Sequence, residues 1–195
     1  MGFGGILRSI LITNRMSQTA YIGLGSNLSS PAGPPSEIVL AAIESLATIG
    51  GISARSSLYR TAPVGYQNQP AFINAAIALR TDQDPESLLK CLLAIERSFG
   101  RDRATGVPKG PRTLDLDLLL MDGLVLETPS LTLPHPELAH RRFVLAPLAE
   151  IAPDLLHPVL RRRMRELLAE LPIDGPNNAD AIQILPSAGP AYRGI

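Results

Sequence analysis

Apolar and polar residues alternate with two different periods along this chain, and these periods predict both strands and helices. Short apolar runs bounded by glycine, proline, serine or asparagine are typical of strands. Such runs lie at 20–24, 52–59, 71–79 and 113–121. Apolar residues three or four positions apart predict helices. The helical series are Val39, Ile43 and Leu46, then Leu88, Leu92, Ile95 and Phe99, and finally Leu160, Met164, Leu167, Leu168 and Leu171.

Turn and cap residues mark the ends of these elements. Asp84 followed by Pro85 is a cap and first-turn pair for the second helix, and Gly100 ends that helix. Prolines and glycines predict two long loops, at 61–70 and 101–111. The order is therefore strand, helix, strand, strand, helix, strand, followed by further helix.

This order predicts a ferredoxin-like βαββαβ core. We expect an α+β fold with a mostly antiparallel sheet, covered by helices on its faces. Many unrelated functions share this architecture, so the function has to be argued from particular side chains.

The length of 195 residues is typical of one domain. We expect a single domain over residues 16–172. Residues 1–15 are glycine-rich and apolar without a regular period, and we expect a disordered extension there rather than a targeting signal. Either Met1 or Met16 could be the start of translation. After residue 172 the periodicity is weak, so we expect 173–195 to be a loosely ordered tail.

The charge balance restricts the class of partner. Eighteen basic and 18 acidic residues give a net charge of zero, which argues against a general nucleic-acid or membrane-surface binder. No stretch approaches the roughly 18 continuous apolar residues that span a bilayer. The one cysteine, Cys91, cannot form an intrachain disulfide, so we expect a reducing compartment, the cytoplasm. All basic residues except Lys90 and Lys109 are arginines, whose forked guanidinium groups suit phosphate.

Two acidic residues on the last predicted strand are the strongest candidates for chemistry. Asp115 and Asp117 are two positions apart, so their side chains share one face of the strand, about 7 Å apart, while the intervening leucines face the core. Such carboxylates repel each other unless a cation lies between them. Mg²⁺ suits this position, because it binds one or two carboxylates and completes its shell with water and substrate phosphates. A solvated acidic face is the alternative.

Basic residues precede this strand. Arg101, Arg103, Lys109 and Arg112 lie on or beside the loop that leads into it, where guanidinium groups could bind phosphate oxygens in pairs. Solvated loop arginines are the alternative for each of them. The chain has neither GxxxxGK[ST] nor GxGxxG after a strand, which excludes a P-loop and a Rossmann site.

One histidine has an unusual setting. His135 lies between Pro134 and Pro136, a fixed loop position where packing rarely requires a histidine. His140 we expect on the surface of a short helix. Three histidines and one cysteine show no zinc-ligand spacing, and the absence of GxSxG argues against a serine hydrolase.

Six segments occur together in a specific order. They are Tyr21-Ile-Gly-Leu-Gly-Ser-Asn-Leu28, Leu58-Tyr-Arg-Thr-Ala-Pro-Val-Gly65, Gln69-Pro-Ala-Phe-Ile-Asn-Ala-Ala76, Ile95-Glu96 with Gly100-Arg101, Gly110 to Leu120, and Leu131 to Leu148. In order and spacing they resemble the 6-hydroxymethyl-7,8-dihydropterin pyrophosphokinase family of folate biosynthesis, over about residues 20–172. The resemblance implies transfer of the pyrophosphoryl group of ATP to the hydroxymethyl oxygen of the pterin, with release of AMP.

The resemblance also implies roles at the nucleotide end of the site. Asp115 and Asp117 match the residues that bind two Mg²⁺ ions, with ATP as co-substrate. Arg101 and Arg112 match arginines that hold the phosphates, and Arg103 is a third candidate. Further positions match ATP-binding residues of the family: Glu96, Leu118, Thr132, His135 and Arg141.

For the pterin, the resemblance implies a flat aromatic site. Phe72 and Phe143 match two rings that sandwich the heterocycle, and Asn74 matches a residue that hydrogen-bonds its edge. Backbone groups from Thr61 through Ala62 to Val64 would complete the pocket.

Some positions depart from the family pattern. Lys109 stands where a tryptophan is frequent, and the loop over 101–111 is one residue longer than the commonest form. Leu93 replaces a frequent glutamine, Pro136 a common tyrosine, and Ala62 the first proline of a Thr-Pro-Pro form. These departures concern closure of the loop and individual ATP contacts.

Two other functions remain as alternatives. A non-catalytic nucleotide- or pterin-binding module of the same fold is one, although retaining two like charges would destabilise a pure binding pocket. A nucleic-acid binder that uses Arg161 to Arg165 is the other, and zero net charge favours a solvated basic helix face instead. We therefore expect ATP and the pterin as small-molecule partners, no nucleic acid, no membrane, and a monomer.

Overall fold

The computed structural model describes residues 17–101, 110–172 and 182–186. Its strands are β1 (Gln18–Ser26), β2 (Gly51–Arg55), β3 (Tyr59–Thr61), β4 (Phe72–Thr81), β5 (Asp115–Met121), β6 (Leu126–Glu127), β7 (Thr132–Leu133) and β8 (Gln183–Ile184). Its helices are α1 (Pro35–Leu46), α2 (Pro85–Ser98), α3 (Arg142–Ile151) and α4 (Met164–Glu170), with a 3₁₀ turn at Leu138–His140.

One antiparallel sheet forms the centre of the molecule. Its order is β5-β1-β4-β3-β8, with β2 also paired to β4, and every pairing is antiparallel. Because β2 and β3 pair with the same neighbour, they act as one broken strand, and the order is that of a ferredoxin-like core. The predicted α+β class and antiparallel sheet are confirmed.

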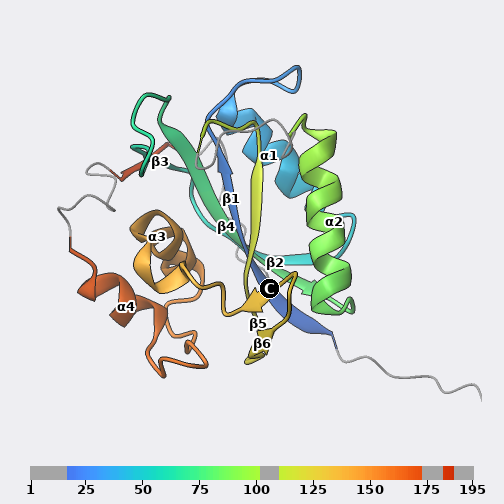
Figure 1. Ribbon diagram of the computed structural model, residues 1–195, viewed down its shortest axis with the longest axis vertical. Helices are drawn as coiled ribbons and strands as arrows, with labels where there is room; N and C mark the ends of the chain where they lie inside the picture. The colour runs from blue at the N-terminus through green and yellow to red at the C-terminus, as the bar shows by residue number, and fades with distance from the viewer. Residues whose placement is uncertain (1–16, 102–109, 173–181, 187–195) are drawn as a thin grey trace, which may run out of the picture.

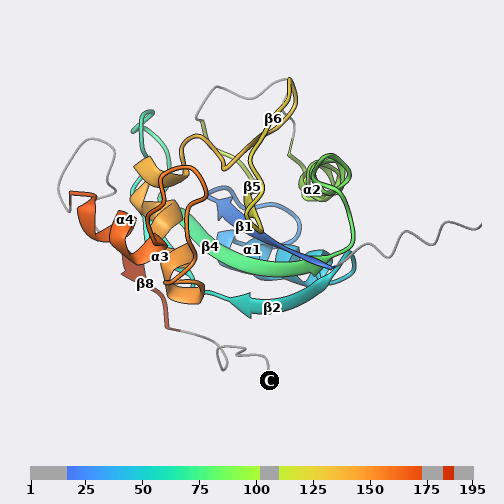
Figure 2. The same ribbon diagram turned by 90° about the horizontal axis from the view of Figure 1, so that it is seen from below.

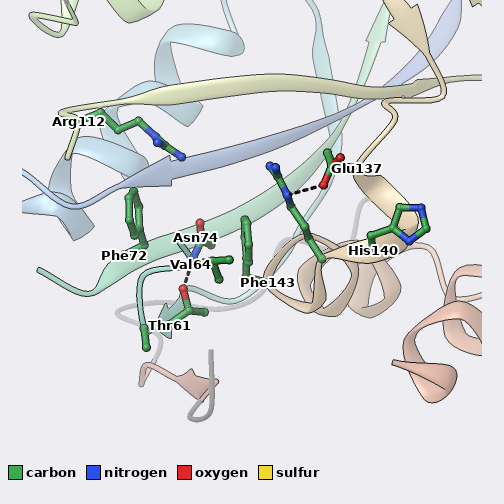
Figure 3. Close-up of a pocket in the computed structure, with 10 residues that line it drawn as sticks. Thr61, Val64, Phe72, Asn74, Arg112, Glu137, His140 and Phe143 are labelled. Carbon is green, nitrogen blue, oxygen red and sulfur yellow. Dashed lines mark hydrogen bonds and ion pairs between the residues drawn. The ribbon is translucent and has the colours of Figure 1, made fainter. Parts of the chain in front are cut away.

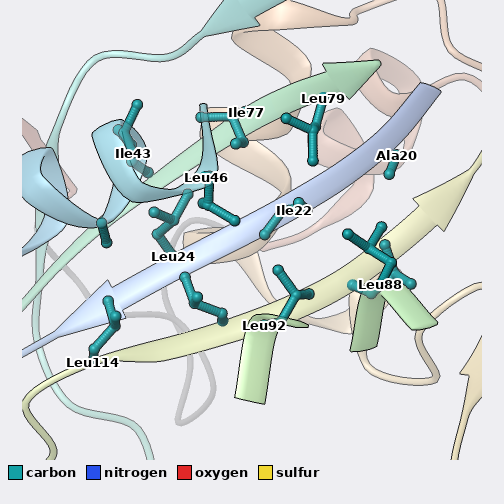
Figure 4. Packing of buried hydrophobic residues seen from close by; sticks show 14 of the residues in the cluster. Ala20, Ile22, Leu24, Ile43, Leu46, Ile77, Leu79, Leu88, Leu92 and Leu114 are labelled. Atoms are coloured by element: carbon teal, nitrogen blue, oxygen red, sulfur yellow. The ribbon is translucent and has the colours of Figure 1, made fainter. Parts of the chain in front are cut away.

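Helices cover the sheet on both faces (Figure 1). α1 and α2 pack on one face over a cluster that includes Ile22, Ile77 and Leu92, as Figure 4 shows. α3 and α4 pack on the other face over a second cluster that includes Leu145 and Met164. In the view from below, α3 and α4 lie together on one side and α2 on the other (Figure 2). No helix in the described ranges is long and apolar enough to cross a bilayer.

An irregularity in β5 changes which way its side chains face. Leu114, Leu116 and Leu118 pack in the first cluster, and Leu119 and Leu120 both pack in the second. The register against β1 shifts at this point, since Tyr21 pairs with Leu120 and the next residue pairs with Leu118. Leu119 is thus the extra residue of a β-bulge.

The single strand predicted over 52–59 is wrong, because two serines interrupt it. The Ser56 hydroxyl accepts a hydrogen bond from Ala76 N and donates to Ser57 O, at 2.9 and 2.8 Å. A side chain therefore takes the place of a backbone partner in the ladder, and the strand divides into β2 and β3.

The helical predictions for the C-terminal third need correction. α3 was not predicted, since Pro147 lies inside it and a proline normally breaks a helix. The last helix is shorter than its apolar series, because Arg161 has a φ of 56° and Leu171 is extended. Within the predicted tail, Gln183 and Ile184 pair with β3 as the short strand β8. Residues 173–181 and 187–195 lie outside the described residues, as does the predicted extension over 1–15.

Three arginines of the basic segment that leads into α4 form ion pairs with acidic side chains. Arg162 contacts Glu166 and Glu170, and the Arg163 and Arg165 guanidinium groups both reach Asp154, at 2.8 and 2.7 Å. Phosphate contacts would have to displace these carboxylates, which argues against the nucleic-acid alternative.

The buried His157 makes stability depend on pH. It is 6% exposed, and its Nδ1 accepts a hydrogen bond from Leu160 N at 3.2 Å. Burial lowers the pKa of His157 below its ordinary 6.5. As the pH falls below about 6.5, the histidine of the unfolded chain therefore binds a proton before that of the folded protein does. The free energy of unfolding then decreases.

We predict that His157→Gln flattens this dependence, because a glutamine oxygen can still accept from Leu160 N but does not titrate. Urea unfolding midpoints at about pH 7.5 and about pH 5.5 measure the effect. A residual slope is expected from His135, whose pKa is also lowered. Equal slopes for the variant and the wild type would contradict the assignment to His157.

Candidate active site

Two glycines form the floor of a hollow on the sheet face that carries α3. In β1, Gly23 pairs with Asp117 and Gly25 pairs with Asp115, while Gly25 also pairs with Asn74 of β4. A Cβ atom on Gly25 would lie 3.1 Å from Asn74 Oδ1, closer than most such contacts. The missing side chains leave a small cavity that all five residues line. We call it the bridging pocket.

The two aspartates share this face, as the alternation in β5 predicts, and the leucines between them are buried. Arg101 Nη2 lies 3.1 Å from Asp115 Oδ1, and Arg112 Nε lies 2.9 Å from Asp115 Oδ2. The Asp115 side chain is 15% exposed and those of the arginines 16% and 23%, so solvent screens these ion pairs less than surface pairs. The two guanidinium groups thus offset the repulsion between the carboxylates.

A buried asparagine holds the backbone around these charges. Asn27 is 2% exposed, and its Nδ2 donates to Gln69 Oε1 and Pro70 O, both at 3.0 Å. Its Oδ1 accepts from Arg112 N at 2.7 Å. Arg112 O in turn accepts from the amides of Asn27 and Leu28 at 3.0 and 3.1 Å. Three segments that are far apart in sequence therefore meet at one side chain, before β4 and β5 begin.

A second hollow, which we call the aromatic pocket, adjoins the bridging pocket and shares Arg112 and Arg141 with it. Its lining residues are Thr61, Ala62, Val64, Phe72, Asn74, Arg112, Glu137, His140, Arg141 and Phe143. All six residues predicted for the pterin belong to this list. Figure 3 shows the rings of Phe72 and Phe143 standing on either side of Asn74. The buried Asn74 Nδ2 donates to Thr61 Oγ1 at 2.7 Å, which fixes the amide between the rings.

Two arginines lie against these rings. The Arg112 guanidinium is 4.8 Å from the centroid of Phe72, and that of Arg141 is 5.8 Å from the centroid of Phe143. Both distances are within the range of a cation–π contact. Each arginine also lines the bridging pocket, so positive charge extends from the aromatic pocket to the aspartates.

Glu137 and His140 also line the aromatic pocket, and the sequence analysis missed both. Arg141 Nε lies 3.3 Å from Glu137 Oε2, an i,i+4 pair. The spacing of Glu137 and Arg141 was a signal that could have found this pair. His140 was expected on the surface of a short helix, and it is indeed exposed at the end of the 3₁₀ turn, from where it also lines the pocket.

A further hollow, which we call the leucine pocket, lies on the other side of Asp117. It is lined by Leu89, Leu93, Leu116, Asp117, Leu118, Thr128, Pro129, Ser130, Leu131, Thr132, His135 and Pro136. Three of the predicted ATP residues, Leu118, Thr132 and His135, therefore come together there. Because Asp117 also lines the bridging pocket, the carboxylates separate the leucine pocket from the aromatic pocket.

His135 is held as a neutral ring at this boundary. Its backbone amide donates to Leu119 O at 2.9 Å, and its Nδ1 accepts from Glu137 N at 3.2 Å. Burial first, and then the charge of Arg141, lower the pKa of His135, partly opposed by Glu137 and Asp115. A neutral imidazole can donate from Nε2 while Nδ1 accepts.

Glu96 differs from the other predicted ATP residues. It is 1% exposed and does not line the three pockets described above. Its Oε1 accepts from Leu116 N at 2.8 Å, and its backbone carbonyl accepts from Arg101 N at 3.1 Å. These two hydrogen bonds connect Glu96 of α2 to β5 and to Arg101, at the start of the loop that leads into β5. Arg103, which was predicted to bind phosphate, and Lys109 both lie outside the described residues.

Among the described residues, Asp115 and Asp117 have no third His, Cys, Asp or Glu side chain placed to share a metal ion with them. No group of three or more His, Cys, Asp or Glu side chains suited to a metal occurs among residues 17–101, 110–172 and 182–186. Two oxygen donors on one strand face, beside a cavity and arginines, suit Mg²⁺, which takes few protein ligands and keeps water or phosphate in its shell.

A sequence profile of a known family matches most of the chain. The family is described as 7,8-dihydro-6-hydroxymethylpterin-pyrophosphokinase, and the match covers residues 21–153. A 2-amino-4-hydroxy-6-hydroxymethyldihydropteridine pyrophosphokinase of Pseudomonas aeruginosa is 43% identical over 162 residues, which are 82% of this chain and 96% of that protein.

Longer proteins contain a similar part. The folic acid synthesis protein fol1 of Schizosaccharomyces pombe is 38% identical over 161 residues, or 82% of this chain, but this chain spans only 21% of that protein. The wild-type Plasmodium falciparum HPPK-DHPS protein with pteroate has a similar fold, with a TM-score of 0.62 at 16% identity, over 80% of this chain and 42% of that one.

We predict that Asn27→Ala destabilises the protein markedly, because it leaves Arg112 N and Pro70 O without their buried partner. The expected loss in the free energy of unfolding is about 3 kcal/mol, measured by urea unfolding. Asn68→Ala is the matched control: this exposed asparagine lies in the same loop as Gln69 and should change stability by less than about 0.5 kcal/mol. Equal effects of the two variants would contradict the role of Asn27.

Proposed function

The chain belongs to the 7,8-dihydro-6-hydroxymethylpterin-pyrophosphokinase family, and on this basis we propose that it transfers the pyrophosphoryl group of ATP to the hydroxymethyl oxygen of 6-hydroxymethyl-7,8-dihydropterin, with release of AMP. One observation carries the proposal most strongly: the aspartate pair lies between an aromatic pocket and a leucine pocket. Two substrates bound in these pockets would meet with their reacting groups at the carboxylates.

The aromatic pocket supports binding of the pterin. Phe72 and Phe143 offer two apolar ring faces, between which a flat heterocycle can stack. Asn74 lies between them, and its bond to Thr61 holds the amide in one orientation. Ala62 and Val64 line the same pocket, and their backbone groups would add polar contacts.

The leucine pocket supports binding of the nucleotide. Leu89, Leu93 and Leu118 supply apolar surface, and Thr132 and His135 supply polar groups beside it. The phosphates would then point toward Asp117 and the arginines. Arg101, Arg112 and Arg141 are the described cations near this path, and guanidinium groups bind phosphate oxygens in pairs. Arg103 remains a candidate for the same role.

Asp115 and Asp117 would hold two Mg²⁺ ions. The donor set fits, since both carboxylates face the bridging pocket and its glycine floor leaves room beside them. When bound, the ions would neutralise phosphate charge and lower the pKa of the pterin hydroxyl. Arg101 and Arg112 contact Asp115 at 3.1 and 2.9 Å, so they hold this carboxylate in place.

The chain's own residues contribute mainly position and charge. The two pockets would bring the hydroxymethyl oxygen and the β-phosphorus of ATP together in line, which removes much of the entropic cost of meeting. The arginines would stabilise the charge that develops on the transferred group. No protein nucleophile is required, because the pterin oxygen is itself the attacking group.

We also propose that the chain acts in the cytoplasm, as its lone Cys91 supports, with ATP and the pterin as its partners and as a monomer of one domain. A non-catalytic binding module of the same fold is the alternative. It would bind the pterin but form no product.

We predict that AMP is released from ATP and Mg²⁺ only when 6-hydroxymethyl-7,8-dihydropterin is added, because the acceptor completes the site. Chromatography of the nucleotides measures this release. If pterin binding is detected by calorimetry with a non-hydrolysable ATP analogue but no AMP forms, the binding module is supported. If neither occurs, the proposed function is wrong.

We further predict that Asp117→Asn lowers the turnover number by about 100- to 1,000-fold, because a neutral amide is a poor ligand for the ions. The same AMP assay measures the loss, and Asp115→Asn should behave similarly. Asp122→Asn is the matched control: this exposed aspartate follows the same strand outside the pockets, and its Oδ1 accepts from Thr19 N, which an asparagine oxygen can also do. Near-wild-type turnover of Asp117→Asn would contradict the metal assignment.

A further inference from the structure

A carboxylate in α3 makes contacts that the proposed reaction does not use. The Glu150 oxygens accept from Ser57 N at 3.0 and 3.1 Å, from Ser57 Oγ at 2.9 Å and from Tyr59 Oη at 2.8 Å. Three donors thus converge on one side chain. They lie at the start of β3 and just before it, more than 90 positions away in sequence.

The position of Glu150 is unfavourable for the helix itself. It lies in the last turn of α3, where the partial negative charge of the helix end disfavours an acid, and that turn has no basic residue. Pro147 also removes one hydrogen bond inside α3. The contacts to β3 supply a reason for an acid at this place.

Tyr59 is arranged as a donor to this carboxylate. Its ring is 6% exposed. Burial and the hydrogen bond to Glu150 raise the pKa of Tyr59 above its ordinary 10, so the hydroxyl stays protonated and keeps donating. On its outer edge β3 also pairs with β8, with Tyr59 opposite Ile184. The strand is therefore held from the helix side and from the sheet edge.

The two elements that Glu150 connects, β3 and α3, both carry residues that line the aromatic pocket. Tyr59 pairs with Asn74, and two positions later Thr61 pairs with Phe72, so β3 carries one wall of the pocket. Phe143 lies in the first turn of α3, seven residues before Glu150 and about two helical turns away on the same helix face. Figure 1 shows α3 beside β3 and β4, and α3 contacts both strands.

We propose that Glu150 is a positioning residue, which fixes α3 against β3 through Ser57 and Tyr59 and thereby sets the gap between the rings of Phe143 and Phe72. The inference rests on the proposed function, in which a pterin occupies that gap. The nucleotide side of the site is held separately by Glu96, which accepts from the backbone amide of Leu116 in the leucine pocket. Loss of Glu150 therefore affects the pterin and spares ATP.

The test compares two affinities in one set of variants. For Glu150→Ala we expect the Kd of 6-hydroxymethyl-7,8-dihydropterin, titrated calorimetrically with Mg²⁺ and a non-hydrolysable ATP analogue, to rise about tenfold, or about 1.4 kcal/mol. The Kd of the analogue alone should stay within about twofold of wild type. Tyr59→Phe should raise the pterin Kd in the same direction. The double variant should be no weaker than Glu150→Ala, because the two side chains act through one contact.

Two controls separate positioning from general stability. Glu44→Ala removes an exposed carboxylate from α1 on the other sheet face and should change neither Kd. Glu150→Gln retains an acceptor oxygen and should recover part of the pterin affinity. Tyr59→Phe removes a single oxygen and decides the question if Glu150→Ala does not fold.

Three results would each overturn the inference. They are an equal loss of affinity for the pterin and for the ATP analogue, additive effects of the two substitutions on the pterin Kd, and a pterin Kd that does not change. The AMP assay on the wild type keeps this result distinct from the proposed function. A wild type that releases AMP with the pterin, together with an unchanged Kd in the variants, refutes the role of Glu150 alone. A wild type that neither binds the pterin nor releases AMP refutes the function.

Discussion

The ion cluster of Asp115 with Arg101 and Arg112 is the interaction on which the rest of the site depends. Two carboxylates about 7 Å apart on one strand repel each other, and the partly buried guanidinium groups at 3.1 and 2.9 Å supply the opposing charge. The cluster keeps its shape because two buried side chains fix the backbone that carries it. Asn27 accepts from the backbone amide of Arg112, and Glu96 accepts from that of Leu116. Charge and backbone therefore stabilise the same strand end from two directions.

The two faces of the sheet carry different kinds of residue. The face under α1 and α2 carries a continuous apolar cluster, which includes Ile22 and Leu116 and anchors β1, β4 and β5. On the other face a second apolar cluster packs under α3 and α4, and the small and polar residues beside it line the bridging pocket. Gly23 and Gly25 belong to the same strand as the buried Ile22. Along β1 and β5, buried core residues therefore alternate with the glycines and aspartates that line the bridging pocket.

Local patterns predicted much of this arrangement. Strict alternation around Asp115 and Asp117 placed both on one face, and the order of elements gave the antiparallel sheet. The resemblance to the family pointed to six of the residues that line the aromatic pocket. Sequence reasoning failed where long-range contacts override local rules. Pro147 is tolerated in a helix that packs on the sheet, although a proline normally breaks a helix. The burial of Glu96 follows from its contact with Leu116 across 20 positions of sequence.

The bulge at Leu119 has a consequence for how this site can change over evolutionary time. On its N-terminal side β5 alternates aspartate with leucine, and beyond the extra residue the alternation starts again in the opposite phase. A deletion of one residue between Asp115 and Leu118 would exchange leucines for carboxylates across the sheet and destroy both core and site. Gain or loss of a residue at the bulge would instead leave the acidic half in phase. The bulge at Leu119 therefore separates two halves of β5 whose side chains alternate in opposite phase. The half beyond Leu119 can change in length while Asp115 and Asp117 keep facing the bridging pocket.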